Sequence, residues 1–441
     1  MTGPSLTVEH APATRRLVLP VILLAQFVIP LSIAGTAVGL PVISAELGTD
    51  PVLLQGVVNG FNIAFALCTV LWGPVADRIG SARAFSWGVL LVVIGSVASG
   101  VSPNLVVLDL ARALAGVGAA AVITGATATI SRSYEGPARA RAFAAFGTIN
   151  GLGLAAGPSI SGVLIGFLGW RAVFLAHAVV LLIALFGSFV LPRRPVAKSG
   201  GGPMLDLGLL RNPGFLSMTL IPVAGAVGFV TLLTYLPAAL QAVHDFSAAE
   251  AGTMMLFMTL PVLLAPTAVH RVTQHRLRVG AAAISLLALA CLLIAPLGLL
   301  LLRPELPPAL IAIPMVFAGL GFGLPLGIVD GRALSFVPPE QSGTAAGLLN
   351  FFRIGSEAVF VALYSAALTA SIRAQPDVAG EAERIAAGQS GHAGAYAAAL
   401  QPVLVGVAVV VLLLGAVFPR LYRRATAGRR RTVDQPASGL E

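Results

Sequence analysis

Charged side chains are scarce in this sequence. They make up 10% of its 441 residues, whereas hydrophobic residues make up 57%. A soluble domain carries roughly 25% charged residues. Because so few charges cannot cover a chain of this length with water-compatible surface, the composition excludes an ordinary soluble protein. We therefore predict that a lipid bilayer surrounds most of the chain.

Cysteine and the residue patterns of enzymes are scarce too. The two cysteines, Cys68 and Cys291, lie in apolar runs, which predicts buried thiols and neither a disulfide framework nor a metal site. We recognise no nucleotide-binding loop, metal-ligand cluster or nucleophile triad. We therefore expect no catalytic residues, no metal and no cofactor, and an enzyme is disfavoured.

The sequence is instead rich in long apolar segments. Crossing a bilayer takes about 20 apolar residues, and twelve such segments can be placed. The first follows Arg15 and Arg16, and it is too long for the apolar part of a cleaved signal peptide. The expected spans are 17–40, 52–74, 84–102, 105–128, 142–167, 171–192, 214–239, 249–269, 279–301, 307–330, 343–370 and 397–419.

Basic residues are distributed unequally between the two sides. With the N-terminus in the cytoplasm, 21 of the 27 lysines and arginines fall in cytoplasmic segments and 4 fall outside. Cytoplasmic loops carry such an excess, so we predict a multi-pass protein of the plasma membrane with both termini cytoplasmic. The net charge of +9 then reflects topology and does not indicate nucleic-acid binding. The predominance of arginine over lysine favours a bacterial source.

A Gly- and Pro-rich segment divides the spans into six and six. We expect an N-terminal bundle at 1–192, a cytoplasmic linker at 193–213, a C-terminal bundle at 214–420 and a cytoplasmic tail at 421–441. The predicted fold is an all-α membrane protein with twelve transmembrane helices in two six-helix bundles. A second long connection, 371–396, could form a short surface helix within DVAGEAERIAAGQ.

The loop between spans 2 and 3 combines glycines with charges. It contains Gly73, Asp77, Arg78, Gly80 and Arg83. The glycines permit a tight turn, and the charges form a cluster at the membrane surface. An ordinary solvated loop is the alternative interpretation.

Three further motifs follow in order. Span 4 reads Arg112-Ala-Leu-Ala-Gly-Val-Gly-Ala-Ala, span 5 contains Gly153, Gly157, Pro158 and Gly162, and Gly169-Trp-Arg leads into span 6. Together with the loop, these motifs resemble those of the major facilitator superfamily. They are most similar to its drug:proton antiporter branch, which often has fourteen spans where this chain has twelve. The resemblance implies the fold above, a gating loop at 73–83 and an antiporter motif in span 5, although helix packing alone could explain the glycines.

One departure from the family concerns proton coupling. Alignment through Leu40 and Pro41 places Ser32 where relatives commonly carry an acidic residue in span 1. The coupling acid must therefore be sought elsewhere. The resemblance also implies that Asp77 meets the start of span 11 near Gly343 and holds the cytoplasmic side shut.

Five ionisable residues stand within the expected spans: Asp109, Arg112, Asp330, Arg353 and Glu357. Each costs roughly 2.5–3.5 kcal/mol near the bilayer centre, so each is a functional candidate. Asp109 and Arg112 share a helix face, as do Arg353 and Glu357, so either pair could be a structural ion pair. Asp330 could form a local pair or a gate contact. We predict that Glu357 carries the coupling proton, with Asp109–Arg112 as the second candidate.

Polar and aromatic residues near the middle of the spans are candidates for a central cavity. They are Gln26, Asn59, Asn62, Asn150, Tyr235, Asn350 and Phe351. A cavity with few charges suits lipophilic or amphipathic small molecules. We therefore predict a monomeric, proton-coupled exporter of drugs or antibiotics. An uptake symporter or lipid exporter of the same fold and a non-transporting membrane receptor or scaffold remain open.

Overall fold

The structure is a computed structural model that describes residues 12–192, 207–275, 280–326, 328–338, 342–386, 388 and 391–433, and all regular elements in these ranges are helices. The first half contains α1 (Pro12–Thr36), α2 (Leu40–Leu47), α3 (Pro51–Ile79), α4 (Ser81–Gly100), α5 (Leu105–Ser133), α6 (Gly136–Leu168) and α7 (Trp170–Gly187). The second half contains α8 (Pro213–Gly225), α9 (Thr231–His244), α10 (Ala248–Met254), α11 (Leu256–His275), α12 (Ala281–Gly298), α13 (Ala312–Gly323), α14 (Ile328–Leu334), α15 (Ser342–Arg373), α16 (Ala382–Ala386) and α17 (Ala393–Val433).

The spans agree with the sequence-based expectation. Eleven segments of the described residues are long and apolar enough to cross a membrane. The remaining predicted span is α3, a helix of 29 residues whose described apolar stretch is Gly56–Thr69. The prediction of an all-α protein with twelve membrane helices is confirmed.

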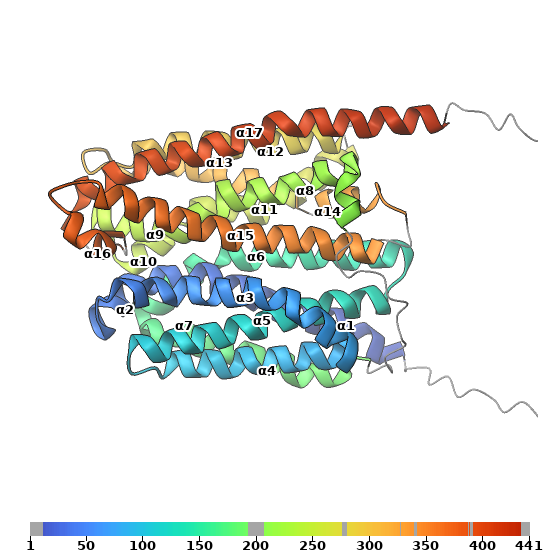
Figure 1. Ribbon diagram of the computed structural model, residues 1–441, viewed down its shortest axis with the longest axis horizontal. Helices are drawn as coiled ribbons and strands as arrows, with labels where there is room; N and C mark the ends of the chain where they lie inside the picture. The colour runs from blue at the N-terminus through green and yellow to red at the C-terminus, as the bar shows by residue number, and fades with distance from the viewer. Residues whose placement is uncertain are drawn as a thin grey trace, which may run out of the picture.

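Figure 1 shows the two halves as two layers of roughly parallel and antiparallel helices, with the N-terminal half, blue to green, below the C-terminal half, yellow-green to red. α1 and α8 begin at one end of the bundle, and α17 ends there; we call it the linker end. α2 and α16 lie at the opposite end, which we call the loop end.

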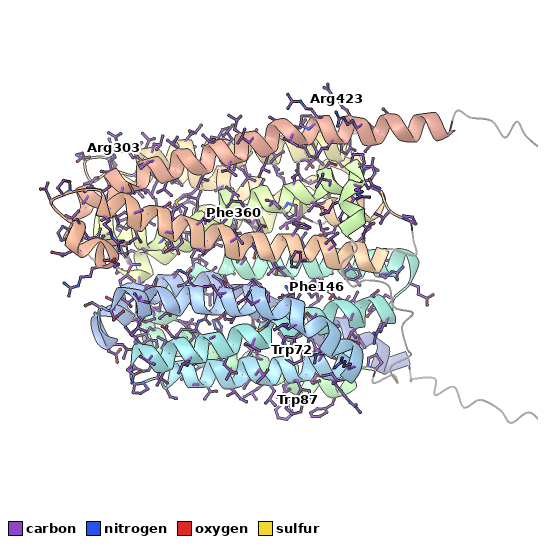
Figure 2. The ribbon with its side chains drawn as sticks, in the orientation of Figure 1. Trp72, Trp87, Phe146, Arg303, Phe360 and Arg423 are labelled. Atoms are coloured by element: carbon purple, nitrogen blue, oxygen red, sulfur yellow. The ribbon has the colours of Figure 1, made fainter. Side chains whose placement is uncertain are left out.

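Apolar side chains cover the outside of the bundle. Trp87 projects from the N-terminal layer with 56% of its surface exposed (Figure 2), and Leu110 and Phe167 are more exposed still. Phe146 of α6, in contrast, is fully buried near the boundary between the layers. Exposed apolar surface on this scale fits contact with lipid.

The two halves meet through a small number of helices. α6 packs on α10 and α11, and α3 packs on α15. Within the halves, α4 packs on α5 and α1 packs on α6. The contacts between the halves are therefore carried largely by α3, α6, α10, α11 and α15.

Local sequence features explain where the helices begin and end. The Asp50 side chain caps α3, because its Oδ1 accepts hydrogen bonds from the backbone N–H groups of Val52 and Leu53. Gly80 separates α3 from α4 with φ of +95°, a conformation that favours glycine. Span 7 contains a π-helical segment, Ala226–Val230, between α8 and α9. π-Helical turns are rare and frequently accompany functional sites.

Three segments refine the predicted boundaries. α17 continues as a helix to Val433, into the expected tail, where alanines and arginines favour helix. Leu207–Arg211 forms a 3₁₀ turn in the expected linker, whereas residues 193–206 lie outside the described residues. The short helix expected in the loop 371–396 is present as α16, but Ala382 and Ile385 are buried, so it packs into the protein.

Candidate functional site

A small central cavity lies between the halves. Glu357 and Asn62 contribute its polar groups, from α15 and α3. The remaining described residues that line it are apolar: Ile33, Phe65, Val230, Ile354 and Val361. Val230 belongs to the π-helical segment. The cavity thus has walls from both halves and, among its described lining residues, one ionisable side chain, Glu357.

Glu357 is nearly inaccessible, with 6% of its surface exposed. Among the described residues, its carboxylate makes no hydrogen bond and no ion pair. Asn62 is also buried, and its side-chain Nδ2 has no hydrogen-bond partner among the residues that the structure describes. A buried carboxylate without a partner is expensive in the charged form, so the cavity favours a bound proton or a bound cation.

Arg353 does not pair with Glu357, contrary to one interpretation of their spacing. Its Nη2 lies 2.7 Å from Oδ1 of Asp330 on α14, and both side chains are buried. The pair rests against Gly147 of α6, where an added Cβ would lie 2.6 Å from the Asp330 Oδ2 and 3.3 Å from the Arg353 Nη1. An ion pair of one half is thus seated on a glycine of the other half, near the linker end.

A second small cavity lies nearer the loop end. Tyr235 of α9 and Ser365 of α15 line it with Leu40, Leu54, Val58, Leu368 and Ala386. The Tyr235 ring stacks on that of Tyr364, with centroids 4.9 Å apart and an interplanar angle of 12°. We call this the tyrosine cavity. Among its described lining residues there is no carboxylate, guanidinium or amine.

Arg112 is almost fully enclosed, with 1% of its surface exposed. Its Nε donates to the carbonyl of Val57 at 3.1 Å, and its Nη1 donates to the Ser32 Oγ at 3.0 Å. Its guanidinium carbon lies 4.5 Å from the centroid of the Phe61 ring. Ser32, at the position where an acid is common in relatives, therefore supplies a neutral acceptor to this buried cation.

Asp109 and Arg112 do not form the ion pair that was one interpretation of their spacing. The Asp109 carboxylate lies against Gly56 of α3, and within the described part of the chain its Oδ1 has no hydrogen-bond partner. Arg112 instead turns toward α1 and α3, where it finds acceptors. His177 of α7 is buried, and no described residue forms a hydrogen bond with either of its ring nitrogens. This cluster lies outside both cavities.

The other cavity candidates are distributed differently. The Gln26 Nε2 donates to the Asn150 Oδ1 at 2.6 Å, and both residues are buried between α1 and α6 of the same half. Neither Asn59 nor Phe351 is among the described residues that line the two cavities. The Asn350 side chain lies outside the described residues.

The span 5 glycines permit close helix contacts of two kinds. Gly153 and Gly157 face backbone atoms of α1, within the same half. Gly162 faces α10 of the other half: an added Cβ would lie 2.8 Å from the Ala248 carbonyl oxygen and 2.9 Å from the Gly252 Cα. Pro158 adds its carbonyl to this crossing, 3.1 Å from a Cβ placed on Gly252. α6 therefore contacts the other half through backbone at the loop end.

The predicted gating loop forms the turn between α3 and α4 at the linker end. Gly73 is buried in α3, Gly80 occupies the turn, and Arg78 and Arg83 are exposed. The Asp77 side chain and its predicted contact near Gly343 lie outside the described side chains, so that contact stays a prediction.

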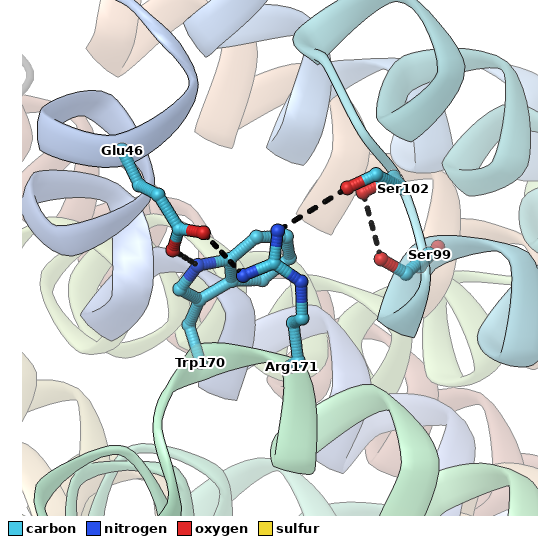
Figure 3. Close-up of polar contacts among 5 residues, drawn as sticks. All are labelled: Glu46, Ser99, Ser102, Trp170 and Arg171. Carbon is cyan, nitrogen blue, oxygen red and sulfur yellow. Dashed lines mark hydrogen bonds and ion pairs between the residues drawn. The ribbon is translucent and has the colours of Figure 1, made fainter.

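A polar cluster at the loop end was not predicted. The Glu46 carboxylate accepts from Trp170 Nε1 at 2.7 Å and pairs with Arg171 Nη1 at 2.5 Å (Figure 3). Arg171 Nη2 also donates to the Ser102 carbonyl at 3.4 Å. The Gly-Trp-Arg motif was visible in the sequence, but its partner Glu46 is separated from it by 124 residues.

α16 also contacts the opposite half at the loop end. Arg384 Nη2 donates to the Thr49 Oγ1 at 3.1 Å, and Ala386 at the end of α16 lines the tyrosine cavity. Arg373 of α15 pairs with Glu383 of α16. The helix is thereby tied to both halves beside the cavity.

Known proteins resemble this chain over most of its length. The family model described as Major Facilitator Superfamily matches residues 22–360. The puromycin resistance protein pur8 of Streptomyces alboniger is 29% identical, with 90% of this chain and 89% of the relative covered. The multidrug resistance protein Stp of Mycobacterium tuberculosis is 28% identical, with coverage of 78% and 74%.

Two more comparisons concern other cargoes and the fold. The riboflavin transporter RibZ of Clostridioides difficile is 24% identical, with 75% of this chain and 83% of the relative covered. A bacterial homolog of the human lysosomal transporter Spinster, solved inward-facing and unoccupied, superposes with a TM-score of 0.66 at 20% identity, covering 94% of this chain and 98% of that one. With the family model covering more than half of the chain, this protein belongs to the major facilitator superfamily and is a membrane transporter.

Proposed function

We propose that this protein exports lipophilic or amphipathic small molecules in exchange for protons, by alternating access. The observation that carries the proposal is Glu357, a buried carboxylate that makes no hydrogen bond or ion pair with the described residues and lies in a cavity walled by both halves. The resistance proteins named above favour drug or antibiotic export over other cargoes.

Proton binding would couple to movement through the cost of burying charge. A charged Glu357 favours a state in which water or a cationic substrate reaches the cavity, whereas a protonated Glu357 tolerates a closed apolar one. One pH unit supplies about 1.4 kcal/mol per proton. A membrane potential of 100 mV adds about 2.3 kcal/mol per charge moved. One or two protons could therefore drive substantial accumulation against a gradient.

Two sets of contacts would act as gates. At the linker end, the Asp330–Arg353 pair rests on Gly147. At the loop end, Gly162 meets Gly252, and Arg384 bonds Thr49. Each set joins the two halves, so each must separate when its side opens. Because basic residues are concentrated in the segments at the linker end, we propose that this end faces the cytoplasm and that the protein lies in the plasma membrane.

The test uses the full chain in proteoliposomes with an imposed pH gradient and puromycin as the first substrate. Wild type and Glu305→Gln, which changes an exposed acid in a loop, should move the substrate against its gradient. Glu357→Gln should lose this pH-driven transport and retain downhill movement. Transport by Glu357→Gln at the wild-type rate would refute the assignment of the proton to Glu357.

Direction distinguishes export from uptake. The relative named a riboflavin transporter keeps another cargo open for comparison. Vesicles of defined orientation, loaded on one side and acidified on the other, should show substrate leaving the side that holds the linker end. Movement only toward that side would replace export by symport. Riboflavin and fluorescent lipids, tested in parallel, cover the other cargoes.

A further inference from the structure

The central cavity is the size of one water molecule. It leaves about 10 Å³ for the centre of a water-sized sphere, which is at the lower limit of the roughly 10–15 Å³ that one buried water needs. A larger ligand can enter only after the two halves have separated. A buried water also needs two to four polar partners, and the lining must be able to supply them.

Glu357 of α15 and Asn62 of α3 supply these partners from opposite halves. Their side chains are buried, with 6% and 4% of each residue exposed. Neither the Glu357 carboxyl group nor the Asn62 Nδ2 forms a hydrogen bond with the residues that the structure describes. The other described lining residues are apolar. These two side chains therefore provide all the polar groups of the described lining, and both still lack a partner within the described part of the chain.

We propose that one water molecule is bound in the central cavity and bridges Glu357 to Asn62, and that Asn62 is the residue that positions this water. The inference rests on the proposed function and gives the coupling acid a partner in the opposite half. When Glu357 is protonated, its O–H donates to the water oxygen, a water O–H donates back to the carbonyl oxygen of the acid, and Asn62 Nδ2 donates to the second lone pair of the water. The water then makes the three hydrogen bonds that are typical of a buried water.

The same water also serves the charged form of Glu357. A water O–H then donates to the carboxylate, and Asn62 Nδ2 still donates to the water oxygen. The bridge connects α3 and α15, which pack on each other across the boundary between the halves. When the halves separate at this level, the bridge breaks and both side chains meet bulk water. Asn62 therefore links the exchange of the proton on Glu357 to the opening of the cavity.

Other occupants of this size satisfy the two side chains less well. A bare cation would find oxygens on two side chains only, and the amide N–H groups of Asn62 repel positive charge. An anion would face the Glu357 carboxylate. A dry cavity would leave the Asn62 donor buried without a partner, which is unfavourable. A neutral molecule that both donates and accepts hydrogen bonds satisfies both side chains.

Infrared difference spectroscopy tests the site on the purified full chain in lipid nanodiscs. Spectra are recorded between alkaline and acidic buffer, once in ordinary water and once in ¹⁸O-labelled water. The protonated Glu357 gives a C=O stretching band, which is identified by its loss in Glu357→Gln. The bound water gives an O–H stretching band, which should move to lower frequency in the labelled water. We expect both bands in the wild-type protein.

Three variants assign the water to Asn62. Asn62→Leu keeps the branched shape of the side chain and removes the donor, so the water band should disappear and the Glu357 C=O band should move to higher frequency. Asn62→Ser keeps a hydroxyl donor and should keep the water band. Thr69→Val is the control: it removes a hydroxyl from the same helix that already donates to the Phe65 carbonyl, and both bands should stay unchanged.

Several results would overturn the water site. They are a water band that persists in Asn62→Leu, a Glu357 band that does not move in this variant, and bands that respond to sodium at constant pH. If Asn62→Leu does not fold, Glu357→Gln decides, because a water band identical to that of the wild type would place the water elsewhere.

Transport in proteoliposomes separates this inference from the proposed function. If pH-driven export occurs without the expected band changes, the water site fails and the exporter stands. If the bands behave as expected but no substrate moves, the water site stands and the exporter fails.

Discussion

Replacing Gly162 by alanine should open the loop end. In the structure an added Cβ would lie 2.8 Å from the Ala248 carbonyl oxygen and 2.9 Å from the Gly252 Cα. Both neighbours are backbone atoms, so no side chain can rotate away to make room. The helices α6 and α10 must separate, and this destabilises every state in which the loop end is closed.

The expected magnitude follows from the cost of overpacking. One extra methyl group in a close contact costs about 1–3 kcal/mol. A cost of this size, borne by one state alone, changes the ratio of open to closed molecules by roughly 5- to 140-fold. The helix-propensity gain of about 1 kcal/mol for Gly→Ala is common to any helical glycine and is removed by a control. Gly406→Ala in α17 serves for this, because its added Cβ meets nothing within 4 Å.

Distances between spin labels measure the outcome. Labels at Pro103 and Glu305, exposed positions in loop-end connections of the two halves, report their separation in a background without Cys68 and Cys291. The distance distribution of Gly162→Ala should move to longer values, whereas that of Gly406→Ala should match the parent. Identical distributions for Gly162→Ala and the parent would show that the glycine contact does not set the conformational balance.

Three further predictions concern single contacts. Ser32→Ala removes the hydrogen-bond acceptor of the buried Arg112 Nη1 and should lower the free energy of unfolding by about 1.5–3 kcal/mol. The loss should appear as a lower melting temperature in detergent, and an unchanged melting temperature would contradict this role. Arg353→Met should destabilise the protein by about 3–5 kcal/mol, because it leaves the Asp330 carboxylate buried without this ion pair. Adding Asp330→Leu should recover most of the loss, and a double variant as unstable as the single one would argue against the pair. Arg384→Ala removes an exposed contact and should lower the free energy of unfolding by less than about 1 kcal/mol. It should nevertheless increase hydrogen exchange in α16, and equal exchange in both proteins would show that Thr49 does not hold the helix.

The span pattern could be predicted from the sequence because hydrophobicity and length decide it locally. A run of about 20 apolar residues has few alternatives to a membrane helix. The irregular parts were not predictable in this way. The π-helical segment Ala226–Val230 has no distinctive composition, and the continuation of α17 to Val433 depends on helix propensity beyond the apolar run.

The ionisable residues within the spans could be identified from the sequence, but their partners could not. Charges inside spans are costly, so Glu357, Arg353 and Asp330 stood out individually. Their pairing depends on how α14 approaches α15, and helical spacing alone suggested Arg353 with Glu357 where the structure pairs Arg353 with Asp330. The Tyr235–Tyr364 stack joins residues 129 positions apart in the sequence, and no local sequence pattern links them.

The glycine crossing at Gly162 and Gly252 has a consequence for redesign. The two halves touch there through main-chain atoms. This contact therefore contains no side chain with which a cargo could interact. The cavity walls, in contrast, are ordinary side chains such as Val58, Val361 and Leu368. If the protein is the proposed exporter, these wall residues can be exchanged for a new cargo without altering the backbone contact at Gly162.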